Sequence, residues 1–144
     1  MRILGLLKAD KDSEAGVMPS PELVAEMGKF IEDVVKAGVL LATDGLKPSA
    51  EGKRIRLAEG KTTVVDGPFT ESKELIASYA LFQVATMAEA IEWTTRFLEV
   101  LGGGEVELRP VFEASDFPSD IFPPEEAARE EAWRQEMQRN AERQ

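Results

Sequence analysis

Residues 76–112 read IASYALFQVATMAEAIEWTTRFLEVLGGGEVELRPVF and carry the clearest strand–helix–strand pattern of the chain. Aromatic and β-branched residues in 76–84 are typical of a strand. Thr86 and Glu89 fit a capping box, which predicts that a helix begins there, and the three glycines at 102–104 end it. Residues 105–112 then alternate between apolar and polar side chains, as in a strand with one face exposed to solvent.

The amino-terminal third shows a similar order of elements. Residues 2–9 form an apolar run that is too short for a typical helix, so we predict a buried strand. We expect a polar loop over 10–19. Ser20 is placed to cap a helix that ends at Gly38, and residues 39–46 predict a second strand.

Between these two regions the sequence predicts a β-hairpin. Residues 54–58 and 61–65 are short strand-like runs that flank Glu59-Gly60, a two-residue turn. The complete order is a βαββαβ plan with an inserted hairpin, which indicates a ferredoxin-like α+β sandwich. Two helices cover only one face of such a sheet. Because 76–84 is apolar on both faces, we predict that a second copy of the chain covers the other face, as a homodimer.

The sequence changes character near its carboxyl end. We assign residues 1–117 to one domain and residues 118–144 to an acidic tail introduced by prolines. Residues 125–143 favour a helix. Two interpretations of this tail stay open. It is a partly frayed helix in solvent, or Phe122 and Trp133 dock onto a neighbouring subunit.

Composition excludes several classes of function. The 144 residues include 17 basic and 27 acidic ones, for a net charge of −10, which argues against binding to nucleic acid or to an anionic membrane. No apolar run has the length of a membrane span, and the first residues lack the pattern of a secretory signal. We therefore expect a cytoplasmic protein without nucleic-acid or membrane partners.

The chain has neither cysteine nor histidine. Disulfides, thiolate nucleophiles, Ser-His-Asp triads and the commonest metal ligands are therefore excluded, and we expect no metal site. No cofactor is indicated, and the composition leaves open whether the protein is an enzyme.

The most unusual stretch is DGPFTESKE, residues 66–74. One interpretation is purely structural. Asp66 accepts backbone N–H groups in a turn, and Gly67 tolerates the conformation that Pro68 imposes on its predecessor. Phe69 inserts into the core, where its burial would contribute about 2 kcal/mol. A folding role alone explains these four residues.

The other interpretation is functional, because the stretch is rich in ionisable residues, namely Asp66, Glu71, Lys73 and Glu74. Here they line a cleft at the end of the sheet, where a partly buried Asp66 acts as a general base and Lys73 orients an anionic substrate or pairs with a carboxylate. The alternative for these charges is a salt-bridged surface loop. Lys8 and Asp10, at the end of the first strand, are candidates for the same cleft. The candidate ligand-binding residues are Lys8, Asp66, Gly67, Pro68, Phe69, Glu71 and Lys73, with Asp66 and Lys73 also the candidate catalytic residues.

DGPFTESKE closely resembles the signature of the DGPF family, the YCII-related domain proteins. Four further segments are similar to the family: KADKDSEAG (8–16), KAGVLLATDGLKPS (36–49), EAIEW (89–93) and EVELRPVFEASDF (105–117). Together they cover roughly residues 1–117. The resemblance implies a ferredoxin-like fold that pairs into a dimeric α+β barrel, in agreement with the pattern of strands and helices.

The resemblance assigns no established activity. Some YCII-related proteins have been suggested to use a His and Asp pair, and because this chain has no histidine, only Asp66 remains as an acid or base. We therefore expect a small-molecule-binding protein, or an acid/base enzyme, with its cleft beside residues 66–74. DGPF proteins are often encoded beside extracytoplasmic-function sigma factors. The alternative is thus a non-catalytic partner in a sigma-factor-linked transcription or stress module.

Overall fold

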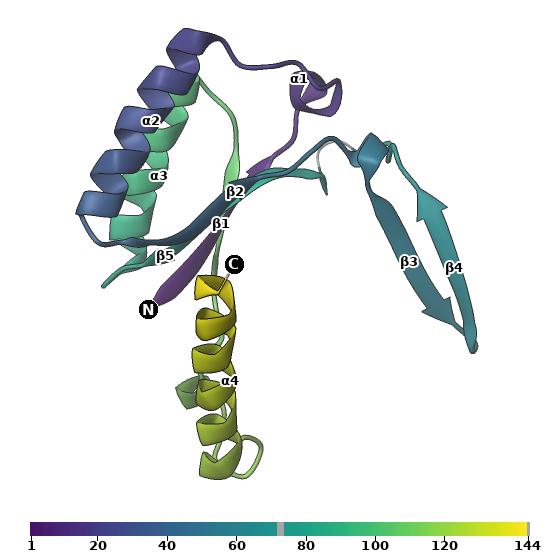
Figure 1. Cartoon of the computed structure of the whole chain (residues 1–144), viewed down its shortest axis with the longest axis vertical. Coiled ribbons are helices and arrows are strands. Elements are labelled where there is room, and N and C mark those ends of the chain that lie inside the picture. The colour runs from purple at the N-terminus through teal and green to yellow at the C-terminus, as the bar shows by residue number, and fades with distance from the viewer. Residues whose placement is uncertain (72–73, 144) are drawn as a thin grey trace. The chain divides into compact units, whose positions relative to one another are not determined.

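The computed structural model describes residues 1–71 and 74–143 (Figure 1). These residues form two compact units, Met1–Val111 and Phe112–Gln144. The first unit contains, in chain order, β1 (Arg2–Lys8), α1 (Lys11–Glu14), α2 (Pro21–Lys36), β2 (Leu40–Gly45), η1 (Ser49–Glu51), β3 (Lys53–Ala58), β4 (Lys61–Asp66), β5 (Ile76–Gln83), α3 (Met87–Leu101) and β6 (Val106–Pro110). The order of strands and helices agrees with the predicted order, apart from the short elements α1 and η1.

Four strands form an antiparallel sheet in the order β2-β5-β1-β6. The helices α2 and α3 pack side by side against one face of this sheet (Figure 1). This order, with one helix after the first strand and one before the last, is the ferredoxin-like arrangement. The predicted α+β fold class is therefore confirmed.

The core lies between the sheet and these two helices. Ile3 on β1 is fully buried, and it packs with Val34 of α2 and Ala90 of α3. Because successive residues of a strand point to opposite faces, Leu4 and Leu6 lie on the face of the sheet away from the helices. The helices thus cover one face only, as the pattern of two helices predicted.

Both long helices begin at the predicted caps. The Ser20 hydroxyl accepts a hydrogen bond from the backbone N–H of Leu23 at 3.1 Å, and the Thr86 hydroxyl accepts one from Glu89 at 3.2 Å. The expected capping box at α3 forms only in part. The Glu89 carboxylate accepts from the N–H of Ala85, one residue before the cap, rather than from the cap residue itself.

Residues 10–19 are not entirely the polar loop that we expected. They include the single helical turn α1, and Asp10 and Ser13 hold its start reciprocally. The Ser13 N–H donates to Asp10 Oδ1 at 2.8 Å, and the Asp10 N–H donates to Ser13 Oγ at 2.9 Å. This pair satisfies backbone donors that a loop would leave to water, which explains why four residues suffice for a helical turn.

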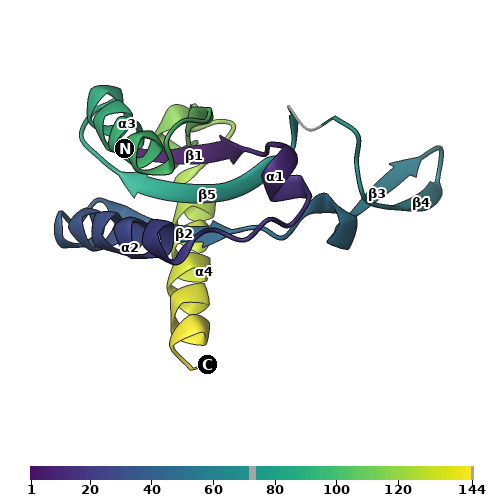
Figure 2. The same cartoon turned by 90° about the horizontal axis from the view of Figure 1, so that it is seen from above.

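The hairpin of β3 and β4 is a separate two-stranded sheet that projects beyond the four-stranded sheet (Figure 2). Its turn residues Glu59 and Gly60 both have positive φ, at 53° and 74°, which confirms the predicted two-residue turn. The register places three apolar side chains on one face of the hairpin. All three are exposed to solvent: Ile55, Leu57 and Val64.

The second unit contains the short helix η3 (Ala114–Asp116) and the long helix α4 (Pro124–Glu142). The helix predicted over residues 125–143 is confirmed. Aromatic rings pack in series before it, with centroids of Phe112 and Phe117 at 4.9 Å and of Phe117 and Phe122 at 5.9 Å. The docking of Trp133 and a domain boundary after residue 117 stay predictions. Across the described residues, none of the helices combines the length and apolar character needed to cross a membrane.

Candidate functional site

Asp66 ends β4 at the base of the hairpin. Its carboxylate pairs with the ammonium group of Lys53, which lies directly opposite on β3. The Asp66 side chain is 74% exposed, so the expected partial burial of this carboxylate is wrong. The reason is that the hairpin extends away from the main sheet. The end of that sheet therefore does not bury the Asp66 carboxylate. Asp66 is thus an accessible, ion-paired acid.

Gly67 makes the closest approach in the turn. Its N–H donates to the Gly52 carbonyl at 3.0 Å, and the following bond to Pro68 is cis. A Cβ atom at Gly67 would lie 1.7 Å from the carbonyl oxygen of Ser49, which is far inside van der Waals contact. Glycine is therefore required here by the approach of a second backbone segment.

Ser49 joins this turn to α1. Its hydroxyl accepts from the Phe69 N–H at 3.0 Å and donates to the Glu14 carboxylate at 2.5 Å. The Ser49 N–H also donates to the same carboxylate at 3.1 Å. Neither Ser49 nor Glu14 was predicted as a site residue, although both lie in segments that resemble the family. The three groups come together only through folding.

Phe69 is half-buried, and it does not join the main core as we expected. The guanidinium of Arg54 lies over its ring, 3.9 Å from the centroid, in cation–π geometry. Phe69 thus fixes the base of the hairpin to the turn. The expected insertion into the core fails because the turn packs on η1 rather than between the sheet and the helices.

Of the remaining candidates in this stretch, the structure describes Glu71 and Glu74. Glu71 is exposed, and its carbonyl accepts from the N–H of Glu74 at 2.9 Å. Lys73 lies outside the described residues. The structure therefore holds Gly67 and Phe69 against η1, whereas Asp66 pairs with the side chain of Lys53 and not with backbone N–H groups of the turn.

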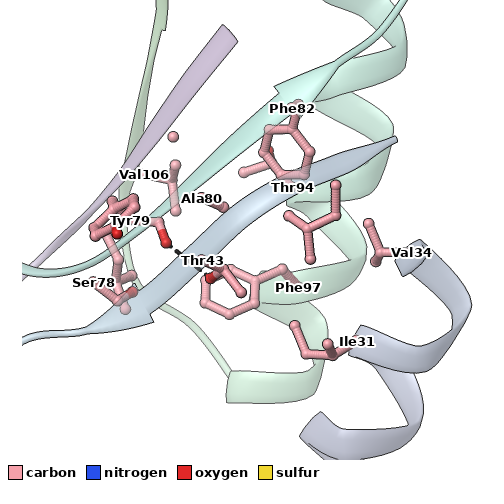
Figure 3. A pocket seen from close by; sticks show the side chains of 13 residues that line it. Ile31, Val34, Thr43, Ser78, Tyr79, Ala80, Phe82, Thr94, Phe97 and Val106 are labelled. Carbon is pink, nitrogen blue, oxygen red and sulfur yellow. Dashed lines mark hydrogen bonds between the residues drawn. The ribbon is translucent and has the colours of Figure 1, made fainter. Parts of the chain in front are cut away.

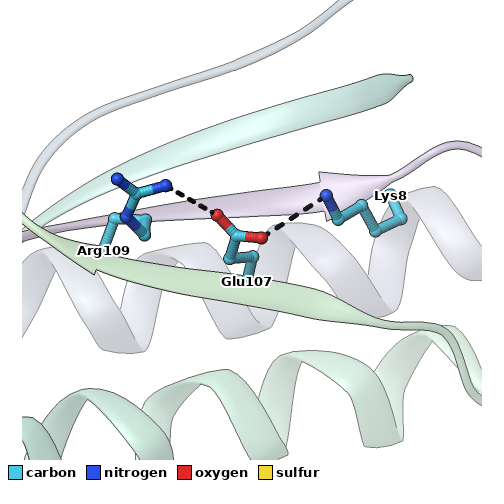
Figure 4. A network of polar contacts seen from close by, with 3 residues as sticks. All are labelled: Lys8, Glu107 and Arg109. Carbon is cyan, nitrogen blue, oxygen red and sulfur yellow. Dashed lines mark hydrogen bonds and ion pairs between the residues drawn. The ribbon is translucent and has the colours of Figure 1, made fainter. Parts of the chain in front are cut away.

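Lys8 lies elsewhere, at the end of β1. Its ammonium is 3.6 Å from Glu107, which also accepts from the Arg109 guanidinium at 3.2 Å (Figure 4). The hydrogen bond from Arg109, together with the nearby charge of Lys8, holds the pKa of Glu107 below its ordinary value. Glu107 therefore stays ionised as the centre of this network on β1 and β6.

A second polar pair links β2 to β5. The Tyr79 hydroxyl donates to Asp44 Oδ2 at 2.7 Å, and this hydrogen bond, with the charge of Asp44, raises the pKa of Tyr79 above its ordinary value. Tyr79 lies opposite Leu6 on β1, so it belongs to the sheet face away from the helices. This pair was not predicted, because it depends on the register between β2 and β5, which the sequence pattern does not determine.

The largest opening in this region is a cleft of about 800 Å³ at the end of the four-stranded sheet. We call it the sheet-end cleft. The end of β1, the turn α1, the loop before α2 and the loop after α3 supply its lining, which includes Lys8, Asp10, Asp12, Ser13, Met18 and Glu105. Lys8 and Asp10 thus line one cleft, but it is not the predicted cleft at residues 66–74. Residues 66–71 do not line it, but Ser49 ties them to α1, which does.

A family model for the YCII-related domain matches residues 1–115. The chain belongs to the YCII-related domain family. The match includes Ser49, the turn after β4 and the whole sheet-end cleft, and it excludes α4. A relative from Rhizobium meliloti (strain 1021), described as uncharacterized protein R00369, is 30% identical over 101 residues, which cover 68% of this chain and 78% of the relative. Its description states no activity, so family membership establishes the domain and leaves its function unknown.

Proposed function

We propose that this YCII-related protein binds a small molecule in the sheet-end cleft, and that the turn after β4 holds a wall of that cleft in place. One observation carries the proposal. The Ser49 hydroxyl sits between the Phe69 N–H and the Glu14 carboxylate, so the turn and α1 share one hydrogen-bonded junction. Residues of α1 form part of the cleft lining. The unusual stretch at 66–69 therefore acts at a distance from the ligand.

The charges around the cleft favour one class of ligand. Its lining contains three carboxylates, from Asp10, Asp12 and Glu105, against the single ammonium of Lys8. A field of this sign favours a cation or an uncharged polar molecule over an anion. Apolar side chains such as Val17 complete the lining. We thus propose a small polar ligand that is uncharged or carries a positive charge.

A separate, enzymatic proposal gives Asp66 the role of acid or base toward a substrate bound at the base of the hairpin rather than in the sheet-end cleft, and Lys73 is the candidate that orients this substrate. The carboxylate is exposed and therefore accessible to a substrate, and the Lys53 ammonium is its ion-pair partner. Asp66→Asn keeps the shape of the side chain and removes its ability to accept a proton. If Asp66 is catalytic, this variant loses turnover while its melting temperature is unchanged. A lower melting temperature with unchanged ligand binding assigns Asp66 to folding alone.

The binding proposal is tested through the junction. We expect that screening small amines and polar uncharged molecules by thermal shift yields compounds that raise the melting temperature of the full chain. Ser49→Ala removes the bridging hydroxyl and should weaken the affinity of such a compound about tenfold, since α1 then loses its anchor. The matched control is Ser115→Ala, because Ser115 is exposed and lies in the second unit.

Equal affinities for the wild type, Ser49→Ala and Ser115→Ala would contradict the role of the junction. Amide shifts in a nuclear magnetic resonance titration locate the bound compound. Shifts confined to residues outside the sheet-end cleft would contradict the proposed site.

We also propose that the protein is a homodimer that pairs through the sheet face opposite the helices. That face carries Leu4, Leu6 and Leu81 in adjacent positions across β1 and β5. Around them lie the Tyr79 pair with Asp44 and the network centred on Glu107. An apolar centre with a polar rim is the usual anatomy of a protein interface.

The alternative function, a non-catalytic partner in a sigma-factor-linked module, is supported by a different observation. Trp133 on α4 is half-exposed, with the Arg129 guanidinium 4.9 Å from its ring. Exposed Trp and Arg side chains are typical anchors of protein interfaces. Under this alternative, deletion of residues 119–144 abolishes capture of a sigma factor by the tagged protein while the melting temperature of the remaining chain is unchanged. Retained capture would contradict it.

A further inference from the structure

A second cavity, separate in its chemistry from the sheet-end cleft, lies between the sheet and the helices α2 and α3 (Figure 3). We call it the inner cavity. Its volume is about 60 Å³, and its lining includes Gly5, Val34, Ala80, Phe82, Thr94 and Phe97. Leu7 is shared by the two openings. Well-packed protein interiors leave few voids larger than one water molecule, so a space of this size needs an explanation.

Gly5 is one cause of the space. It lies on β1 between Ala80 of β5 and Leu108 of β6, on the face that packs against the helices. A Cβ atom at this position would lie 3.4 Å from both Leu108 Cδ2 and Phe82 Cε2, which is ordinary contact. Packing therefore tolerates alanine at residue 5. The glycine leaves open a volume that an alanine methyl group would occupy in part.

Thr94 of α3 places an unpaired polar group in the same lining. Its side chain is only 9% exposed, and its hydroxyl makes no hydrogen bond to any described part of the chain. The two other threonine hydroxyls nearby are paired: Thr43 donates to the Tyr79 carbonyl and Thr95 donates to the Ile91 carbonyl, both at 2.8 Å. Since buried hydroxyl groups are nearly always hydrogen-bonded, to protein or to water, the Thr94 hydroxyl is the group of this lining that would hydrogen-bond to a water or a ligand oxygen inside the cavity.

The lining also restricts what can enter. Among the residues that the structure describes, none of those in the lining is Asp, Glu, Lys or Arg, so a charged molecule would lose its hydration without compensation. Because one water molecule needs about 10–15 Å³ of such a cavity, the inner cavity has room for about four to six water molecules. Apolar side chains supply most of its surface. These limits favour a small, uncharged and largely apolar molecule.

We infer that the inner cavity is a binding site for an uncharged organic molecule of about four to six non-hydrogen atoms, whose single oxygen hydrogen-bonds to the Thr94 hydroxyl. The oxygen belongs to an alcohol or to a ketone, because a threonine hydroxyl both donates and accepts. The apolar remainder of the ligand fills the space beside Gly5. This site is independent of the ligand proposed for the sheet-end cleft, which is polar.

Titration of the full chain with 1-butanol, followed by amide shifts, tests the inference. We expect saturable shifts that centre on Gly5, Ala80 and Thr94, and the same pattern with 2-butanone. Butylammonium and butyrate have similar size but carry a charge, and they should leave these amides unshifted. Saturable shifts with both charged compounds, or no saturable shifts with 1-butanol, would overturn the inference.

Two variants with one matched control test the residues. Gly5→Ala takes up part of the space and should weaken the binding of 1-butanol. Thr94→Val keeps the shape and removes the hydroxyl, so it should weaken 1-butanol binding about tenfold and raise the melting temperature of the ligand-free protein. Thr95→Val, on the adjacent exposed residue, should bind 1-butanol like the wild type.

Each variant is first checked for folding by its melting transition. Should Gly5→Ala fail to fold, Thr94→Val alone decides the test. Unchanged affinity in Thr94→Val overturns the assignment of the hydroxyl. The test is also distinct from that of the sheet-end cleft, because Ser49→Ala should leave 1-butanol binding intact.

Discussion

The glycine at residue 67 shows how a single atom constrains the turn after β4. The Ser49 carbonyl oxygen occupies the space where a Cβ atom would lie, and the Gly67 N–H holds the Gly52 carbonyl from the other side. A side chain of any size at residue 67 must therefore push two backbone segments apart. The contact between this turn and Ser49 therefore depends on the lack of a side chain at residue 67.

Gly67→Ala should lower the free energy of unfolding by about 1–3 kcal/mol, because overpacking of a close contact costs about that much. Urea denaturation measures the change. The control is Gly28→Ala in α2, where a Cβ atom would meet nothing within 4 Å. That control should stabilise the protein by about 0.5–1 kcal/mol, since alanine favours a helix interior. Equal effects of the two substitutions would contradict the close approach at Gly67.

Glu107 makes stability depend on pH in a defined direction. Its pKa is lowered in the folded state, first by the hydrogen bond from Arg109 and then by the charge of Lys8. A carboxyl group with a lowered pKa stabilises the fold above its ordinary pKa of 4.5, and this contribution is lost as pH falls through the lowered value. The melting temperature of wild type should therefore exceed that of Glu107→Gln at pH 7, and the difference should shrink below pH 4.5. A difference that grows in acid would contradict this sign.

For single residues, the sequence predicted local backbone conformation better than side-chain contacts. Gly67 and Pro68 were correctly placed where the chain bends after β4, because their backbone preferences are local, whereas Asp66 belongs to the strand and pairs with Lys53. The hydrogen bonds of Ser49 to Glu14 and the unpaired hydroxyl of Thr94 depend on elements far apart in sequence. Such contacts are set by packing, so a local pattern carries no signal for them.

At the scale of elements, the hairpin and the four-stranded sheet differ in how they are held. The strands β3 and β4 pair with each other only, whereas β1 pairs with strands on both sides. Two-stranded hairpins are marginally stable alone, so the junction at Ser49 and the stacking of Arg54 on Phe69 hold the base of this one. The distal part of the hairpin contributes little to the fold.

Two isoleucines make this difference measurable. Ile55 in the hairpin is 74% exposed, whereas Ile3 in β1 is fully buried. Ile3→Ala should lower the free energy of unfolding by about 2–5 kcal/mol through the lost contacts and the cavity left behind. Ile55→Ala, the matched control, should change it by less than about 0.5 kcal/mol. Urea denaturation followed by tryptophan fluorescence compares the two, and a large loss in Ile55→Ala would show that the hairpin packs against something.

The long elements were predictable because their apolar periodicity extends over many residues. The caps at Ser20 and Thr86 gave the helix starts, and Glu59-Gly60 gave the hairpin turn. The single turn α1 was not predicted, since its stability comes from one reciprocal pair, Asp10 with Ser13, rather than from periodicity. The insertion of Phe69 into the core was wrong because its turn packs on η1.

At the scale of the whole molecule, the two faces of the four-stranded sheet have different coverings. The helices α2 and α3 bury one face, and the other carries Leu4, Leu6 and Leu81. The pattern of two helices for four strands predicted this asymmetry from the sequence. What covers the second face could not be derived from one chain, so the dimer stays a prediction.

Leu6→Lys should convert the proposed homodimer to a monomer, because a charge would be buried at the centre of the apolar face without a partner. Light scattering coupled to size-exclusion chromatography at micromolar concentration measures the mass. Val24→Lys is the control, since Val24 is exposed on α2 in the helical layer. The control should remain dimeric. A monomeric wild type, or equal masses for both variants, would contradict pairing through this face.

The hydrogen bond from the Gly67 N–H to the Gly52 carbonyl closes the base of the hairpin at 3.0 Å. The chain between these two glycines leaves the segment next to η1 and returns to it at nearly the same point. Guest peptides can therefore be grafted between Ala58 and Lys61, or strand residues removed in opposed pairs, without a shift in the register of β1 with β5. The hairpin can therefore be exchanged for another one while its base keeps the same position.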